Sequence, residues 1–341
     1  MNPKYLQMCN RVFGDKVLQS GVCLGKRIGL FEAMQSKNKP WDIATLAKET
    51  HVKEPYLREL IHSYVSSGLL DIKDSKVFVP DWKVFNEVFV SRDLKYVSQF
   101  QEVAPILEKC FTEKGPSGYG HDEAPYVMEY ILSLRAFYNN SIAEELSEKV
   151  IKVHAKKHAD VLDLGCGSGD LTIPFAKALN ASKVHGCDFS ENAITSAKIA
   201  SFSVPNLDFS KQDIHKLPED WTEKFDVILL YDVLHDLQFP GKAMEQVMRV
   251  LKKGGIVIIV DPKVSSNPSE NIGNMLAAQA LTFSTWWCIP SSSCNHGSGH
   301  GVGWGWQNKE KFLTGIPGLE IKSRVCLIKS DYNFAYICKK K

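Results

Sequence analysis

The pattern of apolar and polar positions switches several times between short apolar runs and helical spacing over the second half of the chain. The apolar runs short enough to be strands covered on both faces lie near 160–164, 183–188, 207–210, 225–230 and 255–261. The stretches with helical spacing between them lie near 170–179, 191–202 and 241–252. This alternation predicts an α/β domain, in which a doubly wound sheet carries helices on both faces.

Two more strands are predicted at the end of the chain, near 319–328 and 331–339. Only Lys329 and Ser330 separate them, which is too short for the crossover that parallel strands need. We therefore expect an antiparallel hairpin, so that the last strand runs against the rest of the sheet.

The first part of the chain has a different, helical pattern. A short helix, a turn at 51–53 and a longer helix over 54–67 precede a tight hairpin over 69–79. Together they predict a winged helix-turn-helix domain over residues 1–80.

The obvious function of such a domain is DNA binding, with its second helix in the groove. That helix carries Glu54, Arg58 and Glu59, so it has no basic face. Winged helices also serve as dimerisation units, so a dimerisation or lid role is favoured, and a homodimer through this domain is expected. A helical connector is predicted over 81–155 and the sheet domain over 156–341, with an insertion over 262–317.

A glycine turn follows the first predicted strand of the sheet. Its glycines allow a sharp turn and a close approach to a ligand, and they are Gly165, Gly167 and Gly169. The pattern differs from the dinucleotide fingerprint, whose last position falls on Asp170, and an acid, Asp163, precedes the glycines. Asp188 ends the next strand, where a carboxylate can accept both hydroxyls of an adenosine ribose. The alternative is that Asp188 only caps the following helix, which Ser190 could do equally well.

Several segments together carry a resemblance to a known family. They read DLGCGSG at 163–169, CDFS at 187–190, KQDI at 211–214, FDVILLYDVLHDL at 225–237 and KKGGIVIIVD at 252–261. This set resembles the class I S-adenosylmethionine-dependent methyltransferases, including small-molecule O-methyltransferases with a winged-helix domain. The resemblance covers roughly residues 155 to 340 and implies S-adenosylmethionine as the cofactor.

The resemblance also implies roles for individual residues. Asp163 would hold the ammonium of the cofactor, Gly165 and Gly167 would approach its methionine half, and Asp188 would bind its ribose. Asp213, with Ile214 beside it, would read the adenine. The other positions that the resemblance places among the cofactor-binding residues are Gly169, Phe189 and Tyr231.

His235 is the catalytic candidate, since it follows the fourth predicted strand in a Leu-His-Asp segment similar to that of winged-helix O-methyltransferases. Methyl transfer needs mainly alignment, and a base that removes a hydroxyl proton can add roughly 10²–10⁴-fold. The segment departs from that family where it continues as Leu237-Gln-Phe-Pro240. The alternative is that His235 only hydrogen-bonds cofactor or backbone.

The substrate site is expected on two other segments. In the resembling families the region around Phe137 and Tyr138 covers the cofactor site, so these aromatic residues are candidate pocket walls. The Gly-, Ser-, His- and Trp-rich half of the insertion is a candidate substrate loop, with His296, His300 and Trp304 as contacts. The cysteines and histidines of the insertion match no familiar zinc spacing, so no metal is expected.

Composition adds few constraints. A net charge of +2 forces no polyanionic partner, and nine scattered cysteines suit reduced thiols in the cytoplasm. Neither a signal peptide nor a membrane span is expected. The predicted function is methyl transfer to oxygen or nitrogen of a small molecule, and no nucleic acid partner is expected. The alternatives are a cofactor-sensing DNA-binding regulator and a methyltransferase acting on a macromolecule.

Overall fold

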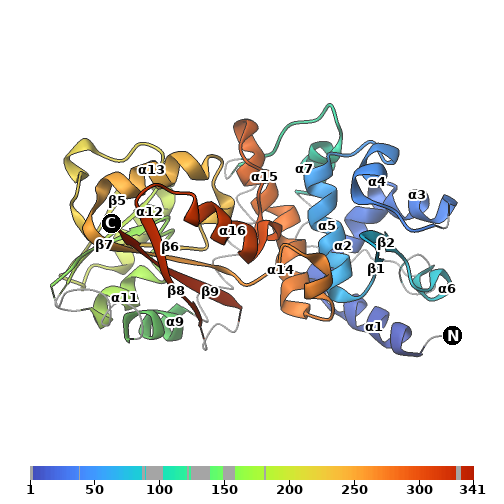
Figure 1. Cartoon of the computed structure of the whole chain (residues 1–341), viewed down its shortest axis with the longest axis horizontal. Helices are drawn as coiled ribbons and strands as arrows, with labels where there is room; N and C mark the ends of the chain where they lie inside the picture. The colour runs from blue at the N-terminus through green and yellow to red at the C-terminus, as the bar shows by residue number, and fades with distance from the viewer. Residues whose placement is uncertain are drawn as a thin grey trace. The chain divides into compact units, whose positions relative to one another are not determined.

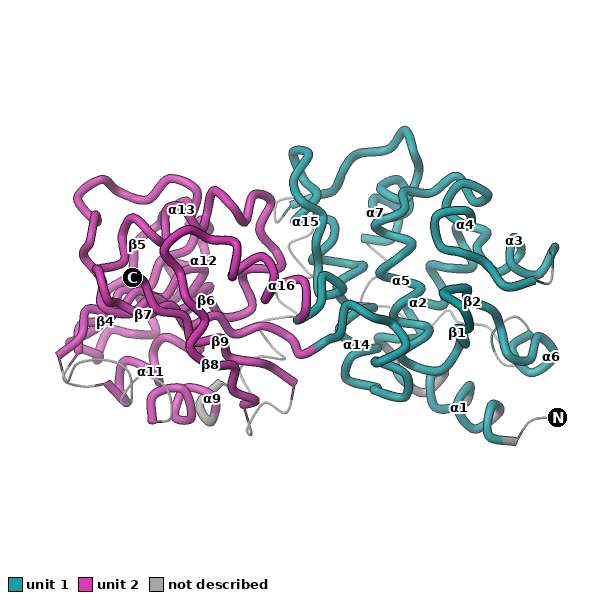
Figure 2. The backbone as a smooth tube through the Cα atoms, viewed as in Figure 1, with its two compact units in different colours: residues 1–127, 264–306 teal, residues 128–263, 307–341 magenta. Residues whose placement is uncertain are grey.

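The computed structural model describes residues 3–37, 39–86, 89, 103–120, 123, 139–148, 158–179, 182–327 and 332–341. The chain forms two compact units, shown in Figure 2. One contains Met1–Val127 and Val264–Trp306, and the other contains Met128–Lys263 and Gln307–Lys341. In the described part of the chain, no helix has both the length and the apolar character that a bilayer crossing requires.

The carboxy-terminal unit is built on a seven-stranded sheet with the strand order β5-β4-β3-β6-β7-β9-β8 (Figure 1). The strands are β3 (Asp160–Leu164), β4 (Lys183–Asp188), β5 (Leu207–Lys211), β6 (Phe225–Tyr231), β7 (Leu251–Pro262), β8 (Leu319–Cys326) and β9 (Asn333–Lys340). The first five are parallel, and β9 runs antiparallel to both of its neighbours, β7 and β8. The predicted doubly wound sheet with an antiparallel last strand is thus confirmed.

Helices cover both faces of this sheet, as Figure 1 shows. They are α9 (Asn139–Leu146), α11 (Thr172–Ala178), α12 (Glu191–Ala200), α13 (Pro240–Val250) and α16 (Gly305–Thr314), whose residues from Gln307 onward belong to this unit. On one face, Leu146 of α9 and Phe175 of α11 pack with Val161, Val227 and Ile258 of the central strands. These fully buried side chains form the main core of the unit.

The strand order reverses between β3 and β6, which pair in parallel at the centre of the sheet. In open α/β sheets, ligands bind outside the carboxyl ends of the strands at such a reversal. The segments that follow β3 and β6 at this edge begin at Gly165 and Asp232. The fold therefore predicts a ligand-binding site at these two segments.

The amino-terminal unit contains each element expected of its first 80 residues. It comprises α1 (Pro3–Gly14), α2 (Lys16–Arg27), α3 (Leu30–Lys37), α4 (Ile43–Glu49), α5 (Glu54–Ser67), β1 (Asp71–Lys73), β2 (Lys76–Phe78), α6 (Trp82–Phe85), α7 (Ala104–Phe111), α14 (Met275–Trp286) and α15 (Cys288–Ser293). Pro55 lies in the first turn of α5, and Gly68 ends the helix in the left-handed region with φ 76°. β1 and β2 form the antiparallel hairpin. The winged-helix assignment of these elements stays an interpretation.

The insertion lies elsewhere than its place in the sequence suggested, since residues 264–306 belong to the amino-terminal unit. The reason is α14, which contains no charged residue and buries side chains around most of its surface. It packs along α5, where Ser63 Oγ donates to the carbonyl of Ala278 at 3.1 Å. On α2, Gly21 leaves room for Thr282, because a Cβ there would lie 2.9 Å from its methyl group. A helix this apolar is stable only where other elements cover it.

Candidate functional site

The glycine turn after β3 takes a shape that side chains would disturb. Gly165 has φ 77°, and a Cβ there would lie 2.5 Å from a methyl group of Val233, which follows β6. Gly167 has φ 55°, and nothing lies within 4 Å of the position that its Cβ would take. The turn therefore packs tightly against the segment after β6 at one glycine and is open at the other.

Asp188, at the end of β4, holds this turn. One of its carboxylate oxygens accepts the N–H of Gly167 at 3.0 Å, and the other accepts the N–H of Ser190 at 2.9 Å. Ser190 itself caps α12 by accepting the N–H of Ala193 at 3.3 Å, so the capping role falls to Ser190. An ionised carboxylate offers about four lone-pair sites, which leaves Asp188 capacity to accept two more hydrogen bonds.

The side chains that follow β4 and β5 suit a nucleoside. Phe189 exposes 53% of its surface next to Asp188. After β5, Ile214 is partly buried, and one carboxylate oxygen of Asp213 accepts both the N–H and the Nδ1–H of His215 at 2.9 Å. An exposed aromatic face, carboxylates with free acceptor sites and an open glycine turn together fit a nucleoside with a polar tail.

Asp163, the next-to-last residue of β3, is buried, with 2% of its surface exposed. The hydroxyl of Thr172 donates to its carboxylate at 2.6 Å. Burial raises the pKa of Asp163 to about 6, against the opposing effect of the Thr172 hydrogen bond, and the nearby charge of Asp188 adds to the rise. Among the described ion pairs, none includes Asp163, so its negative charge is available to a cation.

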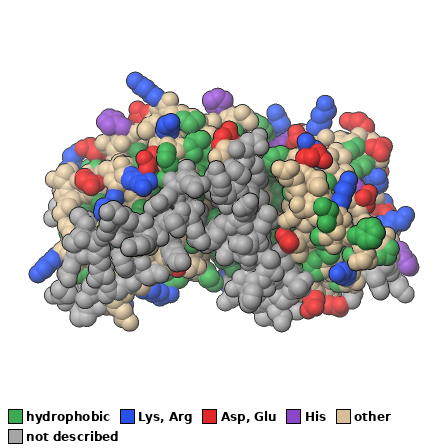
Figure 3. Space-filling model, turned by 180° about the vertical axis from the view of Figure 1, so that it is seen from behind, with side chains coloured by type: hydrophobic (Ala, Val, Ile, Leu, Met, Phe, Trp, Pro, Cys, Tyr) green, Lys and Arg blue, Asp and Glu red, His purple; other side chains and the backbone are tan. Residues whose placement is uncertain are grey.

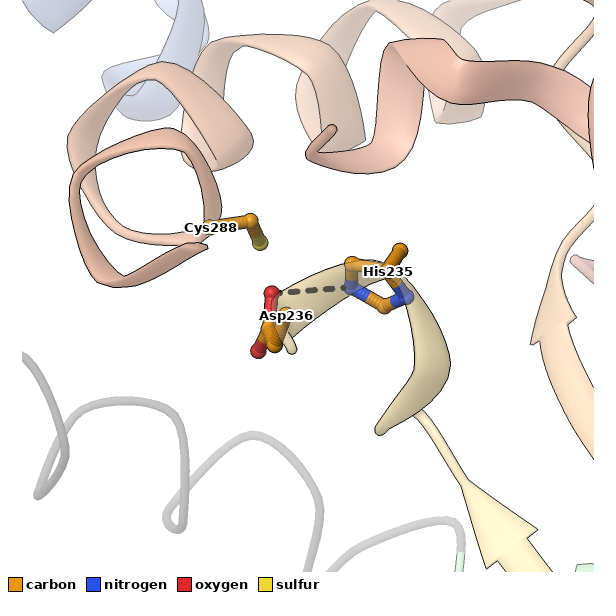
Figure 4. Close-up of side chains that lie close together, drawn as sticks. All are labelled: His235, Asp236 and Cys288. Atoms are coloured by element: carbon orange, nitrogen blue, oxygen red, sulfur yellow. Dashed lines mark ion pairs between the residues drawn. The ribbon is translucent and has the colours of Figure 1, made fainter. Parts of the chain in front are cut away.

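His235 lies on η5 (Leu234–Asp236), a short turn that follows β6. The side chain is 4% exposed, and its Nδ1–H donates to Asp261 Oδ1 at 2.8 Å. Its other ring nitrogen, Nε2, lies 3.3 Å from Asp236 Oδ1, as the dashed line in Figure 4 marks. Both nitrogens of the imidazole therefore face carboxylates.

Asp261 and Lys309 extend this cluster into the interior of the unit. Asp261 lies near the end of β7, and Lys309 comes from α16; both side chains are fully buried, with Lys309 Nζ 3.0 Å from Asp261 Oδ2. Burial disfavours a charge on His235, but Asp236 and Asp261 outweigh burial and raise its pKa to about 9. Burial would raise the pKa of Asp261, yet the cations Lys309 and His235 hold it below its usual value.

Sequence reasoning missed these last two residues. Asp261 did end the segment KKGGIVIIVD, and an acid just inside the carboxyl end of a buried strand was a usable signal. Lys309 gave no signal, because a lysine on a helix with charged neighbours normally faces solvent.

The expected substrate residues lie either in the other unit or outside the described residues. Phe137 and Tyr138 lie outside the described residues. His296, His300 and Trp304 belong to the amino-terminal unit, where the rings of His300 and Trp304 stack with centroids 4.1 Å apart. Among the described residues, none of these three belongs to a group of side chains arranged to hold a metal.

The loop that carries these residues is anchored within its unit. The N–H of Val302 donates to Ser284 Oγ at 2.9 Å, and that of Gly303 donates to the buried carboxylate of Glu59 at 2.8 Å.

Tyr231, the last expected cofactor contact, lies at the end of β6 in the other unit. Its hydroxyl accepts a hydrogen bond from the Asn333 amide at 3.3 Å.

Comparison with known proteins gives one family match and several relatives. Residues 155–310 match the family model described as "Methyltransferase domain". The ubiquinone biosynthesis O-methyltransferase of Candida albicans is 28% identical over 120 residues, 34% of this chain and 36% of that protein. A demethylmenaquinone methyltransferase of Staphylococcus aureus is 33% identical over 130 residues, 38% of this chain and 52% of that protein. The chain thus spans about half the length, or less, of the curated relatives it matches.

Similarity of fold extends further along the chain. An O-methyltransferase family 2 protein from Planctomyces limnophilus, solved in complex with apigenin, aligns with a TM-score of 0.64 at 14% identity, covering 99% of this chain and 96% of that one. The CurJ carbon methyltransferase aligns with a TM-score of 0.54 at 13% identity, over 99% of this chain and 96% of that one.

Proposed function

We propose that this chain, which carries a class I S-adenosylmethionine-dependent methyltransferase domain over residues 155–310, transfers a methyl group from that cofactor to a small-molecule acceptor. The observation that carries the proposal is the turn that Asp188 holds at Gly167, at the strand reversal of the sheet. S-adenosylmethionine supplies a methyl group made reactive by its attachment to a positively charged sulfur.

In this proposal the acidic residues divide the binding of the cofactor among them. Asp188 accepts the ribose hydroxyls with its remaining lone pairs, and the buried charge of Asp163 receives the ammonium. Asp213 and Ile214 contact the adenine. The remaining proposed contacts are Gly165, Gly167, Gly169, Phe189 and Tyr231.

His235 is the proposed general base, acting on a hydroxyl or an amine of the acceptor. Proton transfer is most efficient when the pKa values of donor and base are close. A base with a pKa of about 9 is well matched to a phenolic hydroxyl, whose pKa is about 10. Two of the relatives described above are named for ubiquinone biosynthesis and for demethylmenaquinone, so we propose an aromatic acceptor with a ring hydroxyl.

The DNA-binding alternative is less well supported. Within the amino-terminal unit, α5 buries Tyr56 and Leu57 and every residue from Glu59 to Ser67, so the helix that would enter a groove is covered largely by its own unit. On the face seen in Figure 3, the described Lys and Arg side chains are interspersed with Asp and Glu instead of forming one basic patch. We retain for this unit the proposed role in a homodimer.

Calorimetric titration with S-adenosylmethionine tests cofactor binding. Replacing Asp188 removes the acceptor for the ribose and the bond that holds Gly167, so D188A is expected to weaken binding by about 10–100-fold. The control D220A removes an exposed carboxylate on η4 (Glu219–Trp221) and should bind like the wild type. Equal affinity of D188A and wild type would contradict the proposed site.

Transfer of labelled methyl to a panel of phenols, aliphatic alcohols and amines tests the reaction. We expect a labelled phenol ether from the wild type and a loss of about 10²–10⁴-fold in rate for H235Q at saturating cofactor. If H235Q formed the product as fast as the wild type, the methyltransferase activity would be supported, but His235 would not be the general base. Cofactor binding without any small labelled product would favour a macromolecular acceptor.

A further inference from the structure

Lys309 is buried completely, which calls for an explanation. Lysine is almost never fully buried unless it is paired, and pairing two buried charges is often no more stabilising than packing apolar side chains. The same helix exposes Lys311 two residues further on, so α16 could have kept a lysine in solvent. Lys309 instead lies 3.0 Å from Asp261, whose other oxygen accepts the hydrogen bond from His235.

We propose that Lys309 is a positioning residue that offsets the charge of Asp261, fixes this carboxylate as the acceptor of the His235 Nδ1–H, and so leaves Nε2 as the nitrogen that exchanges a proton. The proposal deepens the role of His235 in the proposed methyl transfer. Its geometry, however, is a property of the protein without cofactor and can be measured without the reaction.

Several charged side chains of the carboxy-terminal unit face His235. Asp236 lies on the same turn as His235, and Asp261 lies on β7. A carboxylate oxygen of Asp232 lies within 4.8 Å of a ring nitrogen of His235 and of a carboxylate oxygen of Asp261. Lys309 is the cation next to Asp261. Tyr336, on β9, is buried, and burial raises its pKa so that it stays neutral.

These charges would hold His235 as an imidazolium if Lys309 were absent. An imidazolium cannot accept a proton, and each further uncompensated carboxylate makes its deprotonation harder. Lys309 offsets the charge of Asp261, the carboxylate nearest to the ring. Asp236 and Asp261 raise the pKa of His235, whereas burial and the charge of Lys309 both lower it. The neutral imidazole is thereby brought within reach of working pH.

The same pairing decides which nitrogen reacts. Lys309 forms an ion pair with the second oxygen of Asp261, and the first oxygen accepts the Nδ1–H of His235, which keeps the proton on Nδ1. Nε2 faces Asp236, which is 26% exposed and can be solvated when Nε2 gives up its proton. A proton taken from an acceptor hydroxyl therefore forms an N–H bond at Nε2, while the O–H bond breaks and its electrons stay on the oxygen.

Nitrogen-15 NMR of histidine-labelled, cofactor-free protein tests this over the range from about pH 5 to about pH 11. H235Q identifies the His235 signals among those of the ten histidines. We expect the wild-type imidazole to lose its Nε2 proton and keep its Nδ1 proton. In K309M the midpoint should rise by about one unit or more, which lowers the neutral fraction at least tenfold at any pH below it.

Control variants separate a charge effect from a packing effect. K311M, on the exposed side of α16, should titrate like the wild type, and K309R should restore most of the wild-type midpoint. If K309M fails to fold, the variant D261N/K309M, which removes both buried charges, takes its place. Its midpoint should fall below that of the wild type, because the nearest carboxylate is lost.

Three results would overturn the proposal. They are a folded K309M with an unchanged midpoint, a D261N/K309M variant with the wild-type midpoint, and a wild-type His235 that titrates at Nδ1. The pH dependence of kcat/KM separates this proposal from the base role. If the NMR midpoint of K309M rises while the acidic limb of its rate profile, where a general base becomes protonated, does not move, Lys309 sets the charge of His235 and His235 is not the base.

Discussion

Asp163 and Asp261 are two buried carboxylates of the same parallel sheet, one near the end of β3 and one near the end of β7, and their surroundings differ in one respect. Asp163 is 2% exposed and accepts a hydrogen bond from Thr172, and its pKa is raised to about 6. Asp261 is fully buried between His235 and Lys309, and its pKa is lowered. Burial pushes both carboxylates towards the neutral form, and only the neighbouring cations keep Asp261 charged.

The two carboxylates differ in whether the protein itself supplies a cation to pair with them. The negative charge of Asp261 is matched inside the protein. Asp163 has no cation in the described ion pairs, so its ionised form gains most from a cation brought by a ligand. This contrast supports the proposed assignment of the cofactor ammonium to Asp163 and of proton transfer to the cluster around Asp261.

The largest expected effect comes from breaking the Asp261–Lys309 pair. D261N leaves Lys309 buried without its carboxylate and should lower the free energy of unfolding by about 3–5 kcal/mol. D261N/K309M removes both charges and should recover most of this loss, and K311M should stay within about 0.5 kcal/mol of the wild type. Urea denaturation at neutral pH measures all of them. If D261N proved as stable as D261N/K309M, Lys309 would not depend on the charge of Asp261 for its burial.

A smaller effect is expected from the titration of His235. Its folded pKa of about 9 lies above the unfolded value of 6.5, so the stability it contributes is complete below pH 6.5 and is lost as the pH rises through 9. A shift of this size corresponds to ~3 kcal/mol. The difference in free energy of unfolding between wild type and H235Q should therefore shrink over that window, as urea titrations at several pH values would measure. A difference that stayed constant would mean that folding does not raise the pKa of His235.

The contrast also marks what the sequence could predict. The doubly wound sheet is confirmed, and residues 155–310 match a methyltransferase domain, because strand-forming runs and the glycine turn are local patterns. The roles of Asp163, Asp188 and His235 stay predictions.

The Asp261–Lys309 pair could not have been predicted in the same way. Its members come from separate elements, and the periodicity of apolar residues within a segment does not show which side chains of distant segments come into contact. The burial of α14 against α5 was missed for the same reason: a uniformly apolar helix shows that it is covered, but not by which element.

The smallest expected effect comes from removing the charge of Asp163. Its folded pKa of about 6 exceeds the unfolded value of 3.8, so its contribution to stability is complete below pH 3.8 and is lost as the pH rises through 6. D163N avoids the buried charge but brings an amide N–H₂ that needs partners, so we expect a net gain of about 1–2 kcal/mol above pH 6 and a loss near pH 4.

Thermal denaturation of D163N and wild type at both pH values measures this change of sign. T172V provides the matched comparison, since removing the hydroxyl from the charged carboxylate should lower stability by about 1–2 kcal/mol above pH 6 and by less near pH 4. If D163N weakens S-adenosylmethionine binding but stabilises the protein without cofactor, the charge of Asp163 is paired only when the ligand is bound. A variant that is more stable and binds equally well would instead make Asp163 a buried structural acid and return the ammonium to another residue.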